Sequence, residues 1–106
     1  MTKEGFFAYV LSATRPEMLS AGPTPNEVSL VERHFAYLSD LTAKGTVLFV
    51  GRTLTTAPDT FGIAVFRAPS EEAARHIMSG DPAVQHGVMS AKLFPFKIVL
   101  HNLTAL

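Results

Sequence analysis

The sequence predicts an α+β domain in which strands and helices follow one another in the order β-α-β-β-α-β. Four segments rich in β-branched and aromatic residues have the composition of strands. Two further segments combine helix start signals with apolar residues at the spacing of a helix. This order is typical of the ferredoxin-like plan, in which an antiparallel four-stranded sheet carries two helices on one face.

The first strand and the first helix are well marked. Residues 6–11 form an aromatic, apolar run that predicts a strand, and a loop rich in proline and glycine follows it. Thr24 is then a typical helix N-cap, Pro25 suits the first helical position, and Glu27 completes a capping box with Thr24. Gly45 is the glycine that commonly follows a helix, so we expect the helix to end there.

The remaining elements follow with similar signals. Residues 46–50 and 61–66 predict the second and third strands, with a turn-rich segment between them. Ser70 is the expected N-cap of the second helix, which has acidic residues in its first turn and ends at Gly80. Residues 88–101 predict a long final strand. We therefore expect a single domain that spans residues 1–106.

Both faces of the predicted sheet are apolar. Alternate residues of the first strand point to opposite faces, with Phe6, Ala8 and Val10 on one and Phe7, Tyr9 and Leu11 on the other. Two helices cover only one face of a four-stranded sheet, so the second face needs another cover. Because no third long helix is predicted, we expect a homodimer in which two sheets pack together.

The final strand changes its apolar phase near Pro95. Before it the apolar positions are odd, as in Met89, Ala91 and Leu93, and around it they become even, as in Phe94, Phe96, Ile98 and Leu100. A proline cannot donate to a strand ladder, so we expect a bulge or kink there, with the second half of the strand in the subunit contact. The alternative is an ordinary edge strand with a mixed face.

Composition and motifs exclude several functions. Nine basic and nine acidic residues give zero net charge, which argues against a nucleic-acid partner. The chain has no cysteine, no signal-peptide pattern and no apolar run long enough to cross a membrane, so we expect a cytoplasmic protein without a membrane partner. Its four histidines form no metal-binding motif, and glycine-rich phosphate loops are absent. We therefore expect no metal and no cofactor.

One rival class shares this element order. RNA-recognition modules have the same β-α-β-β-α-β plan, and residues 60–66 faintly resemble the aromatic motif of their third strand. The basic residue and glycine that lead that motif are Asp59 and Thr60 here, and Ile63 replaces a stacking aromatic residue. Together with the zero net charge, these differences disfavour RNA binding.

A histidine on an apolar helix stripe is the strongest functional signal. Leu30, His34 and Leu38 follow one another at four-residue steps, so the imidazole lies on or beside the buried face. A buried imidazole needs a polar partner, and Asp81, in a Gly-Asp-Pro corner, is the carboxylate that we expect to supply it. The alternatives are a core histidine bonded to a backbone carbonyl and an aspartate that caps a short helix beginning at Pro82.

Several short segments, in the same order along the chain, resemble the YCII-related (YciI-like) family. They are residues 32–38, 48–51, 70–73, 80–82 with 87–88, and 94–97. The resemblance implies a dimeric α/β barrel, an active pair formed by His34 and Asp81, and a pocket between the helices and the sheet near the dimer interface. It also implies an enzyme of small-molecule metabolism. One departure is Gly51-Arg52-Thr53, where many relatives have Gly-Pro.

These observations lead to one functional hypothesis and one alternative. Ionised Asp81 would accept a hydrogen bond from one ring nitrogen of His34, so that the other nitrogen takes a proton from the substrate. Because the reference pKa of histidine is about 6.5, such a ring can act as an acid or a base near neutral pH. Lyase, dehalogenase or isomerase chemistry on a small molecule fits such a pair. The predicted ligand-binding residues are Arg52, Tyr9, Ser12 and Arg15. The alternative is a non-catalytic dimer that binds a small ligand or serves a structural purpose.

Overall fold

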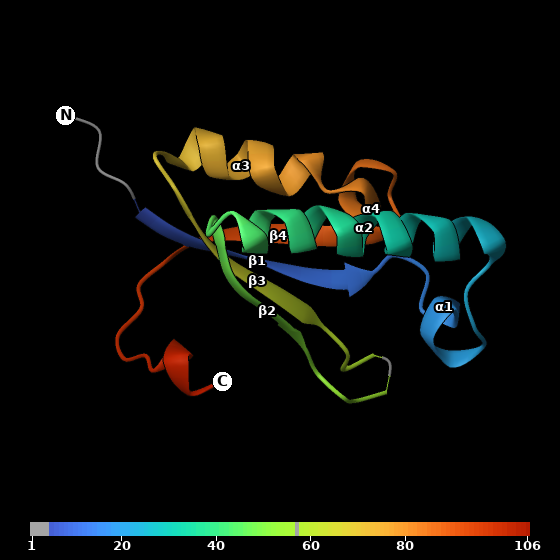
Figure 1. Ribbon diagram of the computed structural model, residues 1–106. Coiled ribbons are helices and arrows are strands. Elements are labelled where there is room, and N and C mark those ends of the chain that lie inside the picture. Colours follow the sequence, from blue (N-terminus) through green and yellow to red (C-terminus); the bar gives the residue numbers. More distant parts are fainter. Residues whose placement is uncertain (1–4, 57) are drawn as a thin grey trace.

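The computed structural model describes residues 5–56 and 58–106. Its sheet has the order β2-β3-β1-β4, with every neighbouring pair antiparallel. The strands are β1 (Gly5–Ala13), β2 (Val47–Arg52), β3 (Gly62–Ala68) and β4 (Met89–Phe96). The helices are α1 (Glu17–Ser20), α2 (Pro25–Ala43), α3 (Glu71–Gly80) and α4 (Pro82–Gln85), and a 3-10 turn, η1, spans Leu103–Ala105. Helices α2 and α3 cover one face of the sheet (Figure 1), as the sequence predicts.

The predicted helix ends are confirmed. The Thr24 hydroxyl accepts a hydrogen bond from the Glu27 amide at 3.2 Å, and the Glu27 carboxylate accepts one from the Thr24 amide at 2.8 Å. The Ser70 hydroxyl caps α3 in the same way through the Ala73 amide. Gly45 follows α2 with a φ of 82°, a left-handed conformation that favours glycine. All these partners lie within a few residues of each other, which is why local patterns predict them.

The main core lies between the sheet and the two long helices. Tyr9 at the centre of β1 lies opposite Ala64 of β3 and Leu93 of β4, and all three side chains point toward the helices. The Phe66 ring packs edge-on against the Tyr9 ring, with 5.7 Å between the ring centroids. Leu38 of α2 completes this layer, so the middle of α2 is held against the middle of the sheet.

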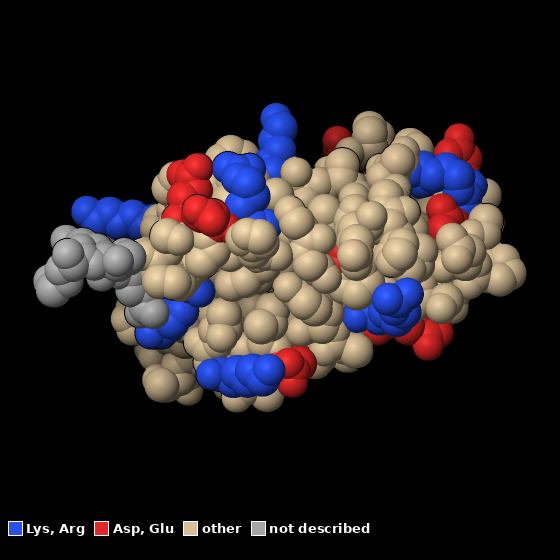
Figure 2. All heavy atoms as spheres, turned by 90° about the horizontal axis from the view of Figure 1, so that it is seen from above, with Lys and Arg blue, Asp and Glu red and all other residues tan. Residues whose placement is uncertain are grey.

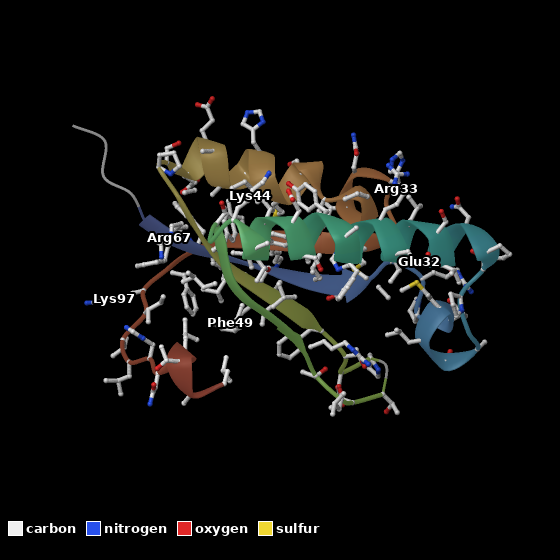
Figure 3. The ribbon with its side chains drawn as sticks, in the orientation of Figure 1. Glu32, Arg33, Lys44, Phe49, Arg67 and Lys97 are labelled. Atoms are coloured by element: carbon white, nitrogen blue, oxygen red, sulfur yellow. The ribbon has the colours of Figure 1, made fainter. Side chains whose placement is uncertain are left out.

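The second face of the sheet is also apolar, as predicted. Phe49, Phe94 and Phe96 lie on it and are each about two-fifths exposed, while Ala8 and Val65 between them are buried. Figure 3 shows Phe49 on the side of the sheet opposite the helices. The C-terminal segment after β4 runs to the same side (Figure 1). Among the described residues no helix is long and apolar enough to cross a membrane.

Two details of the prediction are wrong. Strand β4 ends at Phe96 rather than at residue 101, and its ladder with β1 runs without a register shift past Pro95, which lies opposite Phe7. No bulge is needed because β4 is an edge strand, where proline is tolerated. The alternative of an ordinary edge strand with a mixed face is correct, since Ser90 and Lys92 share the open face of β4 with Phe94 and Phe96. The predicted loop before α2 also contains the short helix α1, which buries Met18.

A close helix contact fixes the corner that follows α3. The Tyr37 hydroxyl on α2 donates a hydrogen bond to the Ile77 carbonyl of α3 at 2.7 Å. A Cβ atom at Gly80 would lie 3.0 Å from that hydroxyl oxygen, so the absence of a side chain at Gly80 allows the two helices to approach this closely. This contact holds the end of α3, and therefore the residue after it, against α2.

Candidate active site

Asp81 occupies the corner between α3 and α4. Its side chain accepts a hydrogen bond from the Ala83 amide at 3.0 Å, which makes it the N-cap of α4. Its own carbonyl accepts bonds from the amides of Val84 and Gln85. The side chain is fully buried, so the predicted capping aspartate is observed and its carboxylate is held in one place by backbone contacts.

The same carboxylate binds the ring of His34. The Nδ1 atom of His34 lies 2.7 Å from Oδ1 and 2.8 Å from Oδ2 of Asp81, across 47 positions of sequence. Because the Ala83 amide and the Tyr9 hydroxyl both donate to this carboxylate, we assign it as an acceptor and His34 Nδ1 as a further donor. The neutral ring then carries its lone pair on Nε2. The structure therefore brings together the two residues that the sequence singles out.

The free nitrogen of His34 reaches the surface. Nε2 has no hydrogen-bond partner among residues 5–56 and 58–106, and every buried side-chain nitrogen or oxygen in this part of the chain has one. His34 lines a groove of about 380 Å³. The groove follows α2 from His34 to Ala43 and is closed on one side by Val50 of β2; apart from His34, its walls carry no ionisable side chain. Phe35 contributes an aromatic ring at its mouth.

Tyr9 is a third member of this cluster. Its hydroxyl donates a hydrogen bond to Oδ2 of Asp81 at 2.8 Å, and its side chain is fully buried. Burial, and then the negative charge of Asp81, raise the pKa of Tyr9 far above its ordinary value, so the hydroxyl remains protonated. A buried tyrosine hydroxyl needs a partner, and its place among the core-facing residues of the first strand was the signal that could have revealed this contact.

The other predicted ligand-binding residues lie apart from this cluster. Arg15 makes a two-point ion pair with Glu27, with distances of 2.9 and 2.6 Å, at the start of α2. Ser12 is exposed on the sheet face opposite the helices, where it lines a second groove together with Lys92. Arg52 is exposed at the end of β2. Ligand binding by these residues stays a prediction.

The charges around the site are sparse. Figure 2 shows basic and acidic side chains interspersed near the margins of the helix-bearing face, with a largely uncharged area between them. Within the described residues, the Asp81 carboxylate is paired with the His34 ring, whose side chain is 13% exposed. No group of three or more histidine, aspartate or glutamate side chains in the described ranges is placed to hold a metal ion.

Comparisons with known proteins point to the same family as the sequence. A model of the YCII-related domain matches residues 7–97. A solved structure of 5-chloro-2-hydroxyhydroquinone dehydrochlorinase from Burkholderia phenoliruptrix, in complex with 2,5-dihydroxybenzoquinone, is 19% identical. It matches with a TM-score of 0.61 over 86% of this chain and 93% of that one. An uncharacterized protein from Thermotoga maritima is 11% identical, with a TM-score of 0.55 over 90% of this chain and 100% of that one. A search of curated protein sequences gives no match. At these identities the two structures bear on the fold alone.

Proposed function

Because the chain belongs to the family of YCII-related domains, we propose that it is an enzyme of small-molecule metabolism in which His34 and Asp81 act as an acid–base pair. One observation carries this proposal. A buried carboxylate holds Nδ1 of His34 at 2.7 and 2.8 Å, while Nε2 is left without a partner beside an open groove. An oriented ring with a free, accessible nitrogen is what proton transfer with a substrate requires.

The proposed reaction begins with proton transfer to Nε2 of His34. Asp81 fixes the tautomer that leaves the lone pair on Nε2, and its charge stabilises the imidazolium that forms. In an elimination, the electrons of the broken C–H or O–H bond form a new double bond, and the leaving group departs with the electrons of its own bond. The protonated ring then gives its proton to the leaving group or to solvent, or, in an isomerisation without a leaving group, to another atom of the substrate. Such lyase, dehalogenase and isomerase reactions begin with the same proton transfer and need no oxidant.

The walls of the groove favour a substrate with an uncharged, flat body. Phe35 offers a ring for stacking, and Ser39 and Thr42 offer hydroxyls, while the lining lacks a cation that would neutralise a phosphate or a dicarboxylate. The dehydrochlorinase with a similar fold acts on a chlorinated hydroxyhydroquinone. Chlorinated hydroquinones and phenols are therefore the first compounds to test.

The proposed functional unit is a homodimer. The sheet face opposite the helices carries three partly exposed phenylalanines (Phe49, Phe94 and Phe96) around buried small residues. A second copy of the chain presents the same apolar surface, and zero net charge means that two copies do not repel each other. Two such faces packed together would give the dimeric barrel that the family resemblance implies.

The test measures chloride release and ligand binding with matched variants. Wild-type protein is incubated with 5-chloro-2-hydroxyhydroquinone and related chlorophenols, and binding of 2,5-dihydroxybenzoquinone is followed by NMR. We expect His34→Asn and Asp81→Asn each to lower turnover by about 100-fold or more. The controls are the same chemical changes at exposed positions, His76→Asn and Asp40→Asn, which should leave turnover unchanged.

Two outcomes would contradict this proposal. Quinone binding without turnover of any compound would favour the alternative, a non-catalytic ligand-binding dimer. Turnover that survives in both His34→Asn and Asp81→Asn would show that the chemistry lies elsewhere in the chain.

A further inference from the structure

We propose that Tyr9 is a positioning residue that sets the proton affinity of the His34–Asp81 pair through its hydrogen bond to Asp81. The inference rests on the proposed acid–base function, because it concerns how strongly the same pair holds a proton. Tyr9 makes no contact with the groove and is fully buried, so it cannot touch a substrate. It acts only through Asp81.

The hydroxyl and the ring of Tyr9 make different interactions. The ring packs against Phe66, and a phenylalanine would fill the same space. The hydroxyl adds the 2.8 Å bond to Oδ2 of Asp81. With the Ala83 amide at 3.0 Å from Oδ1, the carboxylate has donors from β1, α2 and α4. The Ala83 donor is a backbone amide, which a substitution cannot remove without disturbing the chain. The Tyr9 hydroxyl can be removed by Tyr9→Phe.

The direction of the effect follows from charge. When the ring of His34 is neutral, the pair has a net charge of −1, and when the ring is protonated the net charge is zero. A hydrogen bond donated by Tyr9 stabilises the anionic state more than the neutral ion pair. Tyr9 therefore weakens the hold of the pair on its proton, which favours release of the proton after His34 has accepted it. Because the two groups titrate together, this holds for the pair as a unit.

Few other ionisable groups face the pair. From α2, Tyr37 lies near enough for the charge of Asp81 to raise its pKa, although burial is the larger cause. The ionisable residues of α3 (Glu71, Glu72, Arg75 and His76) are all exposed, and α4 has none. On β4, Lys92 points to the opposite face of the sheet, and Arg52 of β2 is exposed. The bond from Tyr9 is thus the main adjustable influence on the pair.

The first experiment removes the hydroxyl. The titration midpoint of the His34 ring is followed by NMR, with its signals assigned by comparison with His34→Asn. In Tyr9→Phe we expect the midpoint to rise by about one pH unit, because the anionic state loses a donor. Tyr37→Phe is the matched control, since it removes a tyrosine hydroxyl that donates to the Ile77 carbonyl rather than to Asp81. Because this bond helps to hold the corner that carries Asp81, Tyr37→Phe should shift the midpoint only slightly, and by much less than Tyr9→Phe does.

A second experiment strengthens the donor. Tyr9 and Tyr37 are the two tyrosines of the sequence, so in the Tyr37→Phe variant Tyr9 is the only one. Biosynthetic incorporation of 3-fluorotyrosine then makes the Tyr9 hydroxyl more acidic, and we expect the His34 midpoint to fall. A purely structural role does not produce shifts of opposite sign in the two experiments. An unchanged midpoint in either one overturns the inference. Because neither needs a substrate, that failure is distinct from a failure to find turnover.

Discussion

At the scale of single residues, Asp81 combines two tasks in one carboxylate. It caps α4 through the Ala83 amide and orients His34 through Nδ1. The two tasks need different properties of the side chain. Capping needs only an acceptor oxygen, which asparagine also has, whereas stabilising the protonated imidazole needs a negative charge, which asparagine lacks.

Asp81→Asn separates these tasks. The amide oxygen still caps α4, so we expect the free energy of unfolding to change little through the cap. The substitution removes the negative charge that favours the protonated imidazole, so we expect the titration midpoint of the His34 ring to fall. NMR titration of the His34 ring measures this change directly. An unchanged midpoint in Asp81→Asn would contradict the contact between the two residues.

These residues also show what a sequence can reveal about a site. His34 and Asp81 can each be recognised from the residues around them in sequence. His34 is a polar residue on an apolar helix stripe, and Asp81 precedes a proline at a helix start. Tyr9 is harder to recognise, because any tyrosine of a core strand needs a hydroxyl partner and that partner lies 72 positions away. Arg15 stands near the end of β1, yet its guanidinium pairs with Glu27. Such pairings depend on tertiary structure.

At the scale of elements, the start of α2 joins a local and a distant interaction. Thr24 and Glu27 form the capping box, and Arg15 binds the same glutamate from the other end of the preceding loop. The hydrogen bond from Arg15, followed by that from the Thr24 amide, lowers the pKa of Glu27 from 4.5 to about 2. The glutamate thus ties the loop that contains α1 to the helix that carries His34.

This depressed pKa predicts a dependence of stability on pH. The folded protein holds Glu27 ionised more firmly than the unfolded chain does, so the stabilisation is complete above the unfolded value of 4.5 and is lost as pH falls toward 2. We expect Glu27→Gln, which can still form the capping box, to be less stable than wild type at pH 7. The difference in urea midpoint should shrink between pH 5 and about pH 2.

The control for this experiment is Glu71→Gln on α3. Glu71 pairs with Arg75 at 3.2 Å, but both side chains are more than half exposed, so the pair is expected to add little. Equal effects of the two substitutions at pH 7 would contradict a special role for Glu27.

Element boundaries show the limits of local patterns in another way. Both long helices begin where their caps predict, since a cap and its amide are neighbours in sequence. The sequence predicts a final strand that is longer than β4, because Ile98 and Leu100 continue the apolar alternation after the chain has left the sheet. Apolar residues after Phe96 resemble a strand in sequence although they lie outside the ladder.

At the scale of the whole molecule, the two faces of the sheet differ in how they are covered. One is covered by α2 and α3, and the other carries partly exposed phenylalanines, of which Phe49 is labelled in Figure 3. The prediction of two apolar faces follows from the alternation of side chains in β1 and is confirmed. The single chain leaves the second face open, so an assembly measurement is needed to test the proposed homodimer.

We expect light scattering at micromolar concentration to give a mass near twice 11.5 kDa. Phe94→Asp places a charge on the open sheet face and should shift the mass to that of a monomer, because an unpaired charge in an apolar interface is strongly unfavourable. Phe35→Asp is the control, since Phe35 is 73% exposed on α2, on the helix side. A monomeric wild type, or a dimer that tolerates Phe94→Asp, would contradict sheet-to-sheet packing.

The long-range contacts of Asp81 also link the site to folding. Tyr9 and His34 lie 72 and 47 positions from Asp81 along the chain, so the network closes only when the first strand, the long helix and the last third of the sequence have docked. No fragment that lacks one of these segments can hold the imidazole in place. A ligand that recognises the oriented ring therefore binds only the completely folded chain, and it raises the free energy of global unfolding by an amount that grows with its concentration relative to its Kd.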